Sequence, residues 1–209
     1  MPNTSTTGST TRTSRTVAGL TWWFSGLPGA GKTTLALALA QALRAQGQAV
    51  CVLDGDELRQ GLSSDLGFSA DDRHEQGRRT AEVARVLNAN QINAVVALVS
   101  PTRQARQAAR DIVGQGRFIE VFVSTPLAVC QQRDPKGLYR RAASQEALGL
   151  TGVQSPYEPP TAAEFTIDTS QTSVAQAVAL LVTSFPTSFF LHRTAAQRPR
   201  LHLLKPTHG

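Results

Sequence analysis

The stretch Gly26-Leu27-Pro28-Gly29-Ala30-Gly31-Lys32-Thr33 decides the fold, and Thr34 follows it directly. It matches the pattern G-x-x-x-x-G-K-[ST], in which glycines let backbone N–H groups turn inward around a phosphate. An apolar run precedes it and a helical pattern follows it, which is the context that the motif requires. The helix N-terminus and the Lys32 ammonium would bind phosphates, and the Thr33 hydroxyl would bind Mg²⁺. The stretch therefore predicts a loop that binds the phosphates of a nucleotide, with a glycine-rich turn that has no ligand as the alternative.

The rest of the chain alternates short apolar runs with helical patterns. The expected strands are Leu20–Phe24, Ala49–Leu53, Ala94–Val99, Phe118–Val123 and Phe165–Ile167. The expected helices are Thr33–Gln46, Asp71–Asn90, Arg103–Val113, Pro126–Gln132 and Ser173–Thr183. Such alternation predicts an α/β three-layer sandwich with a mostly parallel five-stranded sheet, which together with the phosphate loop is the fold of P-loop NTPases and kinases.

Composition predicts one domain with a tail at each end. Residues 1–16 are mostly Thr, Ser and Arg without apolar periodicity, so we expect them to be disordered. The domain is expected over residues 17–183, and residues 184–209 form a basic tail. Glycines and prolines crowd the segment 134–160. A long irregular segment in a compact domain is usually functional, so we expect a lid there.

Charge and hydropathy exclude several classes of partner. The 209 residues are 41% hydrophobic and 17% charged, as in a globular protein, and no apolar run is long enough for a membrane span. The net charge of +6 lies entirely in the two tails, so a basic groove for nucleic acid is not expected. Cys51 and Cys130 stand in apolar surroundings, and we expect two reduced core residues rather than a disulfide or metal site.

Two carboxylates, Asp54 and Asp56, follow the second apolar run. In a parallel sheet they would lie at its carboxyl edge, beside the phosphate loop. One can orient or deprotonate an attacking hydroxyl, and the other can support Mg²⁺ through water. The chain has no Asn-Lys-x-Asp stretch of the kind that GTPases use for guanine. The pattern favours a kinase of a small molecule, with a helix N-cap as the alternative role for either aspartate.

Seven of the arginines that follow the second carboxylate are candidates for binding an anion. Guanidinium groups suit a multiply anionic substrate, whereas ion pairing with nearby acids is the alternative for any one of them. The seven are Arg59, Arg73, Arg78, Arg79, Arg103, Arg106 and Arg110.

Longer pieces of sequence carry a family resemblance. The most specific are Asp65-Leu66-Gly67-Phe68-Ser69 and Arg133-Asp134-Pro135-Lys136-Gly137-Leu138-Tyr139. The other matching pieces, in chain order, are Gly26–Thr33, Leu53–Asp56 with Arg59, Asp72-Arg73 with Arg78-Arg79, Val99–Pro101, Thr151-Gly152 and Pro156–Glu158. With these pieces the chain resembles adenylylsulfate kinases from about Gly19 to Val182. The resemblance implies that the γ-phosphate of Mg-ATP is transferred to the 3′-hydroxyl of adenosine 5′-phosphosulfate (adenylylsulfate), in a cytoplasmic homodimer.

The resemblance also implies roles for individual residues. The implied catalytic group comprises Lys32, Asp54, Asp56 and Ser100, the last as the position of a phosphoserine. Arg133 joins residues 26–34 in binding ATP. Arg59 and Arg73 anchor the phosphosulfate, and Phe68 stacks on the adenine. The remaining acceptor-binding positions are Gln76, Val99, Ser100, Lys136 and Leu150.

Some positions depart from the family's usual residues. The family usually has Asn at Gln76, an apolar residue at Gly77 and Phe at Leu150. The family also usually has Asn at Ser63, an aromatic residue at Thr102 and Asp at Ala105. Because these changes fall mostly on the acceptor side, a same-fold kinase of another small acceptor is one alternative. A degenerate nucleotide-binding homologue is the other, although Lys32, Asp54 and Arg133 are retained.

Overall fold

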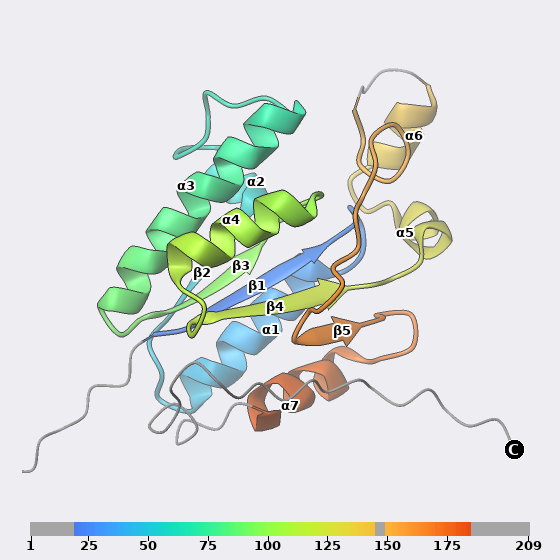
Figure 1. The fold of residues 1–209 in the computed structure, drawn as a ribbon. Coiled ribbons are helices and arrows are strands. Elements are labelled where there is room, and N and C mark those ends of the chain that lie inside the picture. Colours follow the sequence, from blue (N-terminus) through green and yellow to red (C-terminus); the bar gives the residue numbers. More distant parts are fainter. Residues whose placement is uncertain (1–18, 145–148, 185–209) are drawn as a thin grey trace, which may run out of the picture.

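The computed structural model describes residues 19–144 and 149–184, and its centre is a five-stranded parallel sheet (Figure 1). The strands are β1 (Thr21–Gly26), β2 (Val50–Asp54), β3 (Asn93–Ala97), β4 (Phe118–Val123) and β5 (Phe165–Ile167). They lie in the order β2-β3-β1-β4-β5, and every adjacent pair is parallel. The carboxyl ends of all five strands therefore meet at one edge, and the predicted α/β fold is confirmed.

Helices cover both faces of the sheet. On one face α1 (Lys32–Ala45) packs beside α7 (Val174–Ser184), and on the other α3 (Ala70–Ala89) packs beside α4 (Arg103–Val113) (Figure 1). Three short helices, α2 (Gly55–Leu58), α5 (Leu127–Arg133) and α6 (Leu138–Ala143), follow the carboxyl ends of β2 and β4. This arrangement gives the three layers that the strand–helix alternation predicts.

The central strand β1 fills both halves of the core. Successive strand side chains point to opposite faces, so Trp22 and Trp23 enter different hydrophobic clusters. Trp22 packs in the cluster of α1 and α7, with Phe165 at a ring distance of 6.3 Å. Trp23 packs in the cluster of α3 and α4 and stacks on Phe118 at 5.4 Å. Because β1 is buried on both sides, the loop that follows it is held by the whole core.

The expected elements agree closely with the structure, with three differences. Strand β3 ends at Ala97 rather than at Val99, because Ser100 adopts a positive φ of 44° and the chain turns there. Helix α2 was not expected, since four residues carry no periodic signal. The segment 134–160, expected to be irregular, contains helix α6. The tails 1–16 and 184–209 lie outside the described residues, apart from Ser184 at the end of α7.

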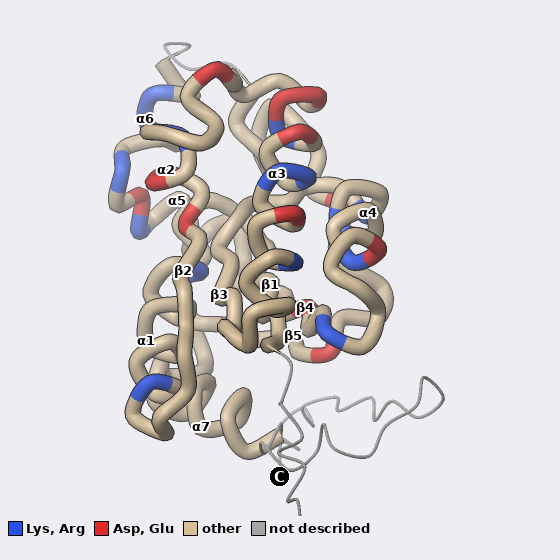
Figure 2. Tube along the Cα trace, turned by 90° about the vertical axis from the view of Figure 1, so that its left-hand side faces the viewer, with Lys and Arg blue, Asp and Glu red and all other residues tan. Residues whose placement is uncertain are grey.

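Both cysteines are free thiols: Cys130 is buried, as expected, and Cys51 is partly buried. Among the described residues, no helix combines the length and the apolar character that crossing a membrane requires. Figure 2 shows basic and acidic positions interspersed along α3 and α4. The described fold thus carries the mixed charge that the balanced middle of the sequence predicts.

Gly77 offers a test of helix energetics. It lies inside α3, and a Cβ added there would meet no atom within 4 Å. We expect Gly77→Ala to raise the free energy of unfolding by about 0.5–1 kcal/mol, because alanine loses less backbone entropy in a helix. Urea denaturation measures the change. Gly19→Ala is the contrast: its Cβ would lie 2.3 Å from the Ile92 carbonyl oxygen, so this variant should be less stable than the parent. A destabilised Gly77→Ala would contradict the open space seen in α3.

Candidate active site

The phosphate loop requires its glycines for geometric reasons. Gly29 and Gly31 have φ values of 74° and 100°, a region that favours glycine. A Cβ on Gly26 would lie 2.5 Å from the Val123 carbonyl oxygen of the neighbouring strand. Gly31 then forms the N-cap of α1 without a side-chain cap, which leaves the first N–H groups of the helix for a ligand. The loop between β1 and α1 is thus shaped as an anion site.

Lys32 begins α1 and lies at the floor of this loop. Its ammonium donates a hydrogen bond to the Leu27 carbonyl oxygen at 2.8 Å. Burial lowers the pKa of Lys32 to about 8, although the nearby Asp54 and Asp56 carboxylates act in the opposite direction. A bound phosphate would favour the charged form and so raise this pKa.

Thr33 and Asp54 meet beside the loop. The Thr33 hydroxyl donates to Asp54 Oδ2 at 2.7 Å, while Asp54 Oδ1 accepts from the backbone N–H of Asp56 at 2.9 Å. Asp54, rather than Asp56, is therefore the N-cap of α2. The hydroxyl and carboxylate oxygens are the donor types that Mg²⁺ takes, and they fit an ion that is also bound by phosphates. The described residues contain no cluster of three or more His, Cys, Asp or Glu that would hold a metal unaided.

Asp56 takes a different partner. Its carboxylate forms an ion pair with the Lys136 ammonium, which lies in the predicted lid. Both side chains are exposed, so the pair is open to exchange with a ligand. The predicted lid segment thus contacts α2 at the carboxyl end of β2.

Arg133 is placed at the loop by a residue that the sequence analysis missed. Its guanidinium donates to the hydroxyl and the carbonyl oxygen of Thr169, at 2.6 and 3.0 Å. The Thr169 hydroxyl lies 2.9 Å from the Ala30 carbonyl oxygen, and Thr125 bonds to the same carbonyl. Thr169 is the second residue after the end of β5, so its position at the carboxyl edge of the sheet was the available signal.

The first part of the predicted lid is well ordered and linked to the phosphate loop. Asp134 has a φ of 25° and accepts hydrogen bonds from the backbone N–H groups of Tyr139 and Arg140, both at 3.1 Å. These bonds fix the turn that leads into α6. The Tyr139 hydroxyl donates to the Pro28 carbonyl oxygen at 2.9 Å. Helix α6 is therefore attached to the phosphate loop itself.

Phe68 and two arginines, which are predicted to form the acceptor side of the site, lie together. Phe68 is 61% exposed, and the guanidinium carbons of Arg59 and Arg73 lie 4.4 and 5.7 Å from its ring centre. Both arginines bond to backbone carbonyls, Arg59 to Leu66 and Arg73 to Phe68. Neither forms a salt bridge with a described carboxylate. Burial lowers the pKa of both groups, and the Arg59 charge also lowers that of Arg73, so the pair favours a bound anion.

The other five arginines are structural, which corrects the expectation of a single anion-binding cluster. Arg78 and Arg79 form ion pairs with Glu75, and Arg79 also pairs with Asp65. The remaining three connect α4 to its neighbours. They are Arg103, bound to the Pro159 carbonyl oxygen, Arg106, paired with Glu120, and Arg110, paired with Glu164.

The remaining predicted site residues are more deeply placed. Gln76 is buried and donates to the Gly55 carbonyl oxygen at 2.9 Å, between the two aspartates. Ser100 accepts a hydrogen bond from the Trp23 indole at 2.9 Å, while Val99 is partly exposed beside it. Leu150 is 8% exposed and belongs to the hydrophobic cluster that contains Tyr139. Leu150 thus contributes to packing, and the adjacent Gly149 carbonyl accepts from Arg73 at 3.2 Å.

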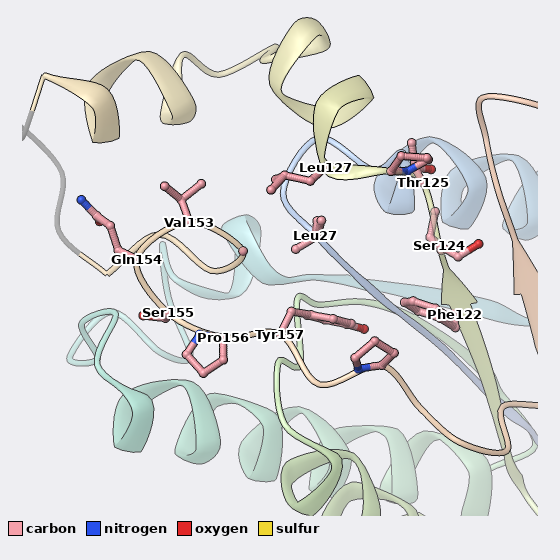
Figure 3. Close-up of a pocket in the computed structure, with 14 residues that line it drawn as sticks. Leu27, Phe122, Ser124, Thr125, Leu127, Val153, Gln154, Ser155, Pro156 and Tyr157 are labelled. Atoms are coloured by element: carbon pink, nitrogen blue, oxygen red, sulfur yellow. The ribbon is translucent and has the colours of Figure 1, made fainter.

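A pocket of about 530 Å³ lies beside the phosphate loop (Figure 3). Leu27 and Leu127 line one side, and Tyr157, stacked on Phe122 at 5.8 Å, lines another. Gly152 also borders it, with a φ of 90°, and a Cβ there would lie 2.6 Å from Leu27 Cδ2. Among the predicted site residues, Leu27 alone lines this pocket, so it is distinct from the acceptor side.

Fold and site together define a P-loop kinase. The model of the adenylylsulphate kinase family matches residues 18–168. An adenylyl-sulfate kinase of Shewanella pealeana is 52% identical over 160 residues, 77% of this chain and 78% of the relative. The chain belongs to the adenylylsulfate kinase family and is a phosphotransferase.

Solved structures agree with this assignment. The APS kinase of Mycobacterium tuberculosis, solved in complex with AMPPNP and APS, has a TM-score of 0.75 and 39% identity. The alignment covers 78% of this chain and 96% of that one. A hexameric APS kinase from Thiobacillus denitrificans has a TM-score of 0.60 and 34% identity, over 80% of this chain and 28% of that one.

The lowered pKa of Lys32 predicts a pH dependence of ATP binding. The ammonium is the form that binds phosphates, and it is lost as pH rises through about 8 in the free enzyme. We expect the Kd for ATP to be level below that pH and to rise above it by up to about tenfold per pH unit. Isothermal titration calorimetry between pH 6.5 and pH 9.5 gives the profile. In Lys32→Arg, whose charge does not titrate, any binding that remains should lack this rise. A flat profile in the parent protein would be evidence against Lys32 as the phosphate-binding charge.

Proposed function

We propose that this chain transfers the γ-phosphate of ATP to the 3′-hydroxyl of adenosine 5′-phosphosulfate, giving ADP and 3′-phosphoadenosine 5′-phosphosulfate. The observation that carries the proposal is the group formed by Phe68, Arg59 and Arg73. An exposed ring between two guanidiniums without carboxylate partners offers a base-stacking surface next to an anion site. A nucleotide with a phosphosulfate has both features. The related mycobacterial APS kinase was solved in complex with APS.

On the donor side, the phosphate loop and Lys32 bind the ATP phosphates. Residues 26–34 supply backbone N–H groups and the positive end of α1. Arg133, held by Thr169, supplies a second positive charge. Thr33 would hold Mg²⁺, supported by whichever of Asp54 and Asp56 does not take the acceptor proton, and the ion would neutralise charge on the phosphates.

The proposed transfer is direct. The 3′-hydroxyl oxygen forms a bond to the γ-phosphorus while the bond from that phosphorus to the β,γ-bridging oxygen breaks, and ADP leaves with the electron pair. Asp54 or Asp56 takes the hydroxyl proton, and Lys32 neutralises the charge that develops on the leaving oxygen. Ser100 has its hydroxyl buried against Trp23, which favours a structural role over a phosphoserine intermediate.

On the acceptor side, Arg59 and Arg73 bind the phosphosulfate, and the adenine stacks on Phe68. Val99 offers its backbone near the ring. Gln76 holds the Gly55 backbone by a hydrogen bond to its carbonyl oxygen. The segment around Leu150 closes the acceptor side, where the Gly149 carbonyl oxygen accepts a hydrogen bond from Arg73. Lys136 exchanges its bond to Asp56 for a bond to substrate as the lid segment 134–160 covers the nucleotides.

The proposal extends to the assembly and the tails. We propose a cytoplasmic homodimer in which residues 1–16 and 184–209 take no part in catalysis. The hexameric relative shows that larger assemblies occur among APS kinases. Light scattering after size-exclusion chromatography measures the mass of the full chain, and a hexamer would overturn the dimer.

A coupled assay of ADP release tests the proposed reaction. Adenylylsulfate is compared with nucleosides, sugars and other hydroxyl acceptors, in the presence of Mg-ATP. We expect adenylylsulfate to have the highest kcat/KM of the panel, because Phe68 and the two arginines match its base and its anion. A higher value for another acceptor would replace this proposal with a kinase of that molecule. No turnover with any acceptor, but retained ATP binding, would indicate a degenerate homologue.

Phe68→Ala should raise the KM for adenylylsulfate and leave the KM for ATP nearly unchanged. Stacking of a base on an aromatic ring contributes about 1–3 kcal/mol, so a rise of about 5- to 150-fold is expected. Leu62→Ala is the matched control, since Leu62 is 45% exposed in the same loop. Steady-state titration of each nucleotide separates the two constants. If Phe68→Ala instead raises the KM for ATP and leaves that for adenylylsulfate unchanged, Phe68 belongs to the donor site.

A further inference from the structure

One buried guanidinium joins three parts of the molecule that are far apart in sequence. Arg106, in α4, is 3% exposed. Its Nη1 donates to the Ser100 carbonyl oxygen and its Nη2 donates to the Glu158 carbonyl oxygen, each at 2.6 Å. Its Nε lies 2.8 Å from Glu120 Oε1 on β4. Arg106 thus connects the end of β3, the end of the predicted lid segment and β4.

The first of these parts is a turn that needs support. Ser100 has a φ of 44°, a left-handed conformation that L-residues adopt only at a steric cost. Arg106 holds its carbonyl oxygen, and the Trp23 indole holds its hydroxyl. The preceding residue, Val99, accepts a hydrogen bond from the N–H of Gly26 at 3.3 Å. The turn therefore lies against the first residue of the phosphate loop.

The second part is the end of the lid segment, which is fixed rather than free. The Glu158 N–H donates to the Pro101 carbonyl oxygen at 2.8 Å. The Glu158 carboxylate accepts from the N–H of Arg103 at 2.8 Å, at the N-terminus of α4 where a negative charge is favoured. The Tyr157 hydroxyl lies 3.2 Å from Ser25 Oγ on β1. The segment thus has its fixed end at residues 157–159, next to the Ser100 turn.

We propose that Arg106 is a positioning residue for the acceptor nucleotide. It holds the Val99–Ser100 turn, which the proposed function assigns to the acceptor side, at a fixed position relative to residues 157–159. Its planar guanidinium donates two N–H groups to two fixed carbonyl oxygens and lies beside the Glu120 carboxylate, whereas a lysine ammonium is a single point of charge. Arg106 is too deeply buried to contact a substrate, so its effect on the reaction passes through these two backbone carbonyls.

The test compares Arg106→Lys with Arg110→Lys. Arg110 lies one helical turn further along α4, is 6% exposed and also faces Glu120, at 3.5 Å. Its other bonds go to Glu164 and to the Phe118 carbonyl oxygen, away from Ser100 and Glu158. Both variants should lower the free energy of unfolding. We expect only Arg106→Lys to lower kcat/KM for adenylylsulfate, by about 10- to 100-fold, with the KM for ATP changed less than about twofold.

The inference rests on the proposed function, and the parent protein separates the two. If the parent does not phosphorylate adenylylsulfate, the proposed function fails. If the parent does, but Arg106→Lys and Arg110→Lys have equal effects on the adenylylsulfate constants, Arg106 is merely structural and the inference is overturned. If Arg106→Lys does not fold, Arg106→Met/Glu120→Gln removes both charges of the buried pair together. The same loss of kcat/KM for adenylylsulfate is expected from it, and a normal value would overturn the inference.

Discussion

The burial of β1 on both faces is the constraint on which the rest of the structure depends. A strand that ends in a phosphate loop must place that loop to within a fraction of an ångström, and β1 does so because its two tryptophans anchor both layers of the core. Its neighbours then leave no room for a side chain at Gly26. The fixed loop positions Lys32 and Thr33, and Thr33 in turn contacts Asp54 at the end of β2. Donor-side chemistry follows from the packing of one central strand.

Pairing with carboxylates divides the arginines by role. Arg78, Arg79, Arg106 and Arg110 are neutralised by acids, so their charges stabilise the fold. Arg59 and Arg73 bond to carbonyl oxygens instead, which orients each guanidinium without cancelling its charge. Two like charges held close together repel each other, and a bound anion relieves that repulsion. The repulsion between the two guanidiniums in the free protein therefore increases the affinity for an anionic substrate.

Sequence patterns predicted the sheet, the long helices and the phosphate loop, because each has a strong local signal: apolar runs, helical periodicity and glycine spacing. They did not predict α2 or α6, which are too short for periodicity. The sequence could not separate paired from unpaired arginines either, because a partner such as Glu164 of Arg110 lies far along the chain. Thr169 was missed for the same reason: its contact with Arg133 exists only once β5 is placed in the sheet.

Gly152 shows how far the phosphate loop extends beyond its motif. Its α-carbon lies against the Leu27 side chain, and its backbone conformation also excludes other residues. A substitution there would push aside the end of the Leu27 side chain and hold a non-glycine residue at a positive φ. Such a variant would retain an intact motif in every sequence comparison and still carry strain beside the phosphate loop. Natural variation at this position is therefore to be judged by the stability of the segment that packs on Leu27.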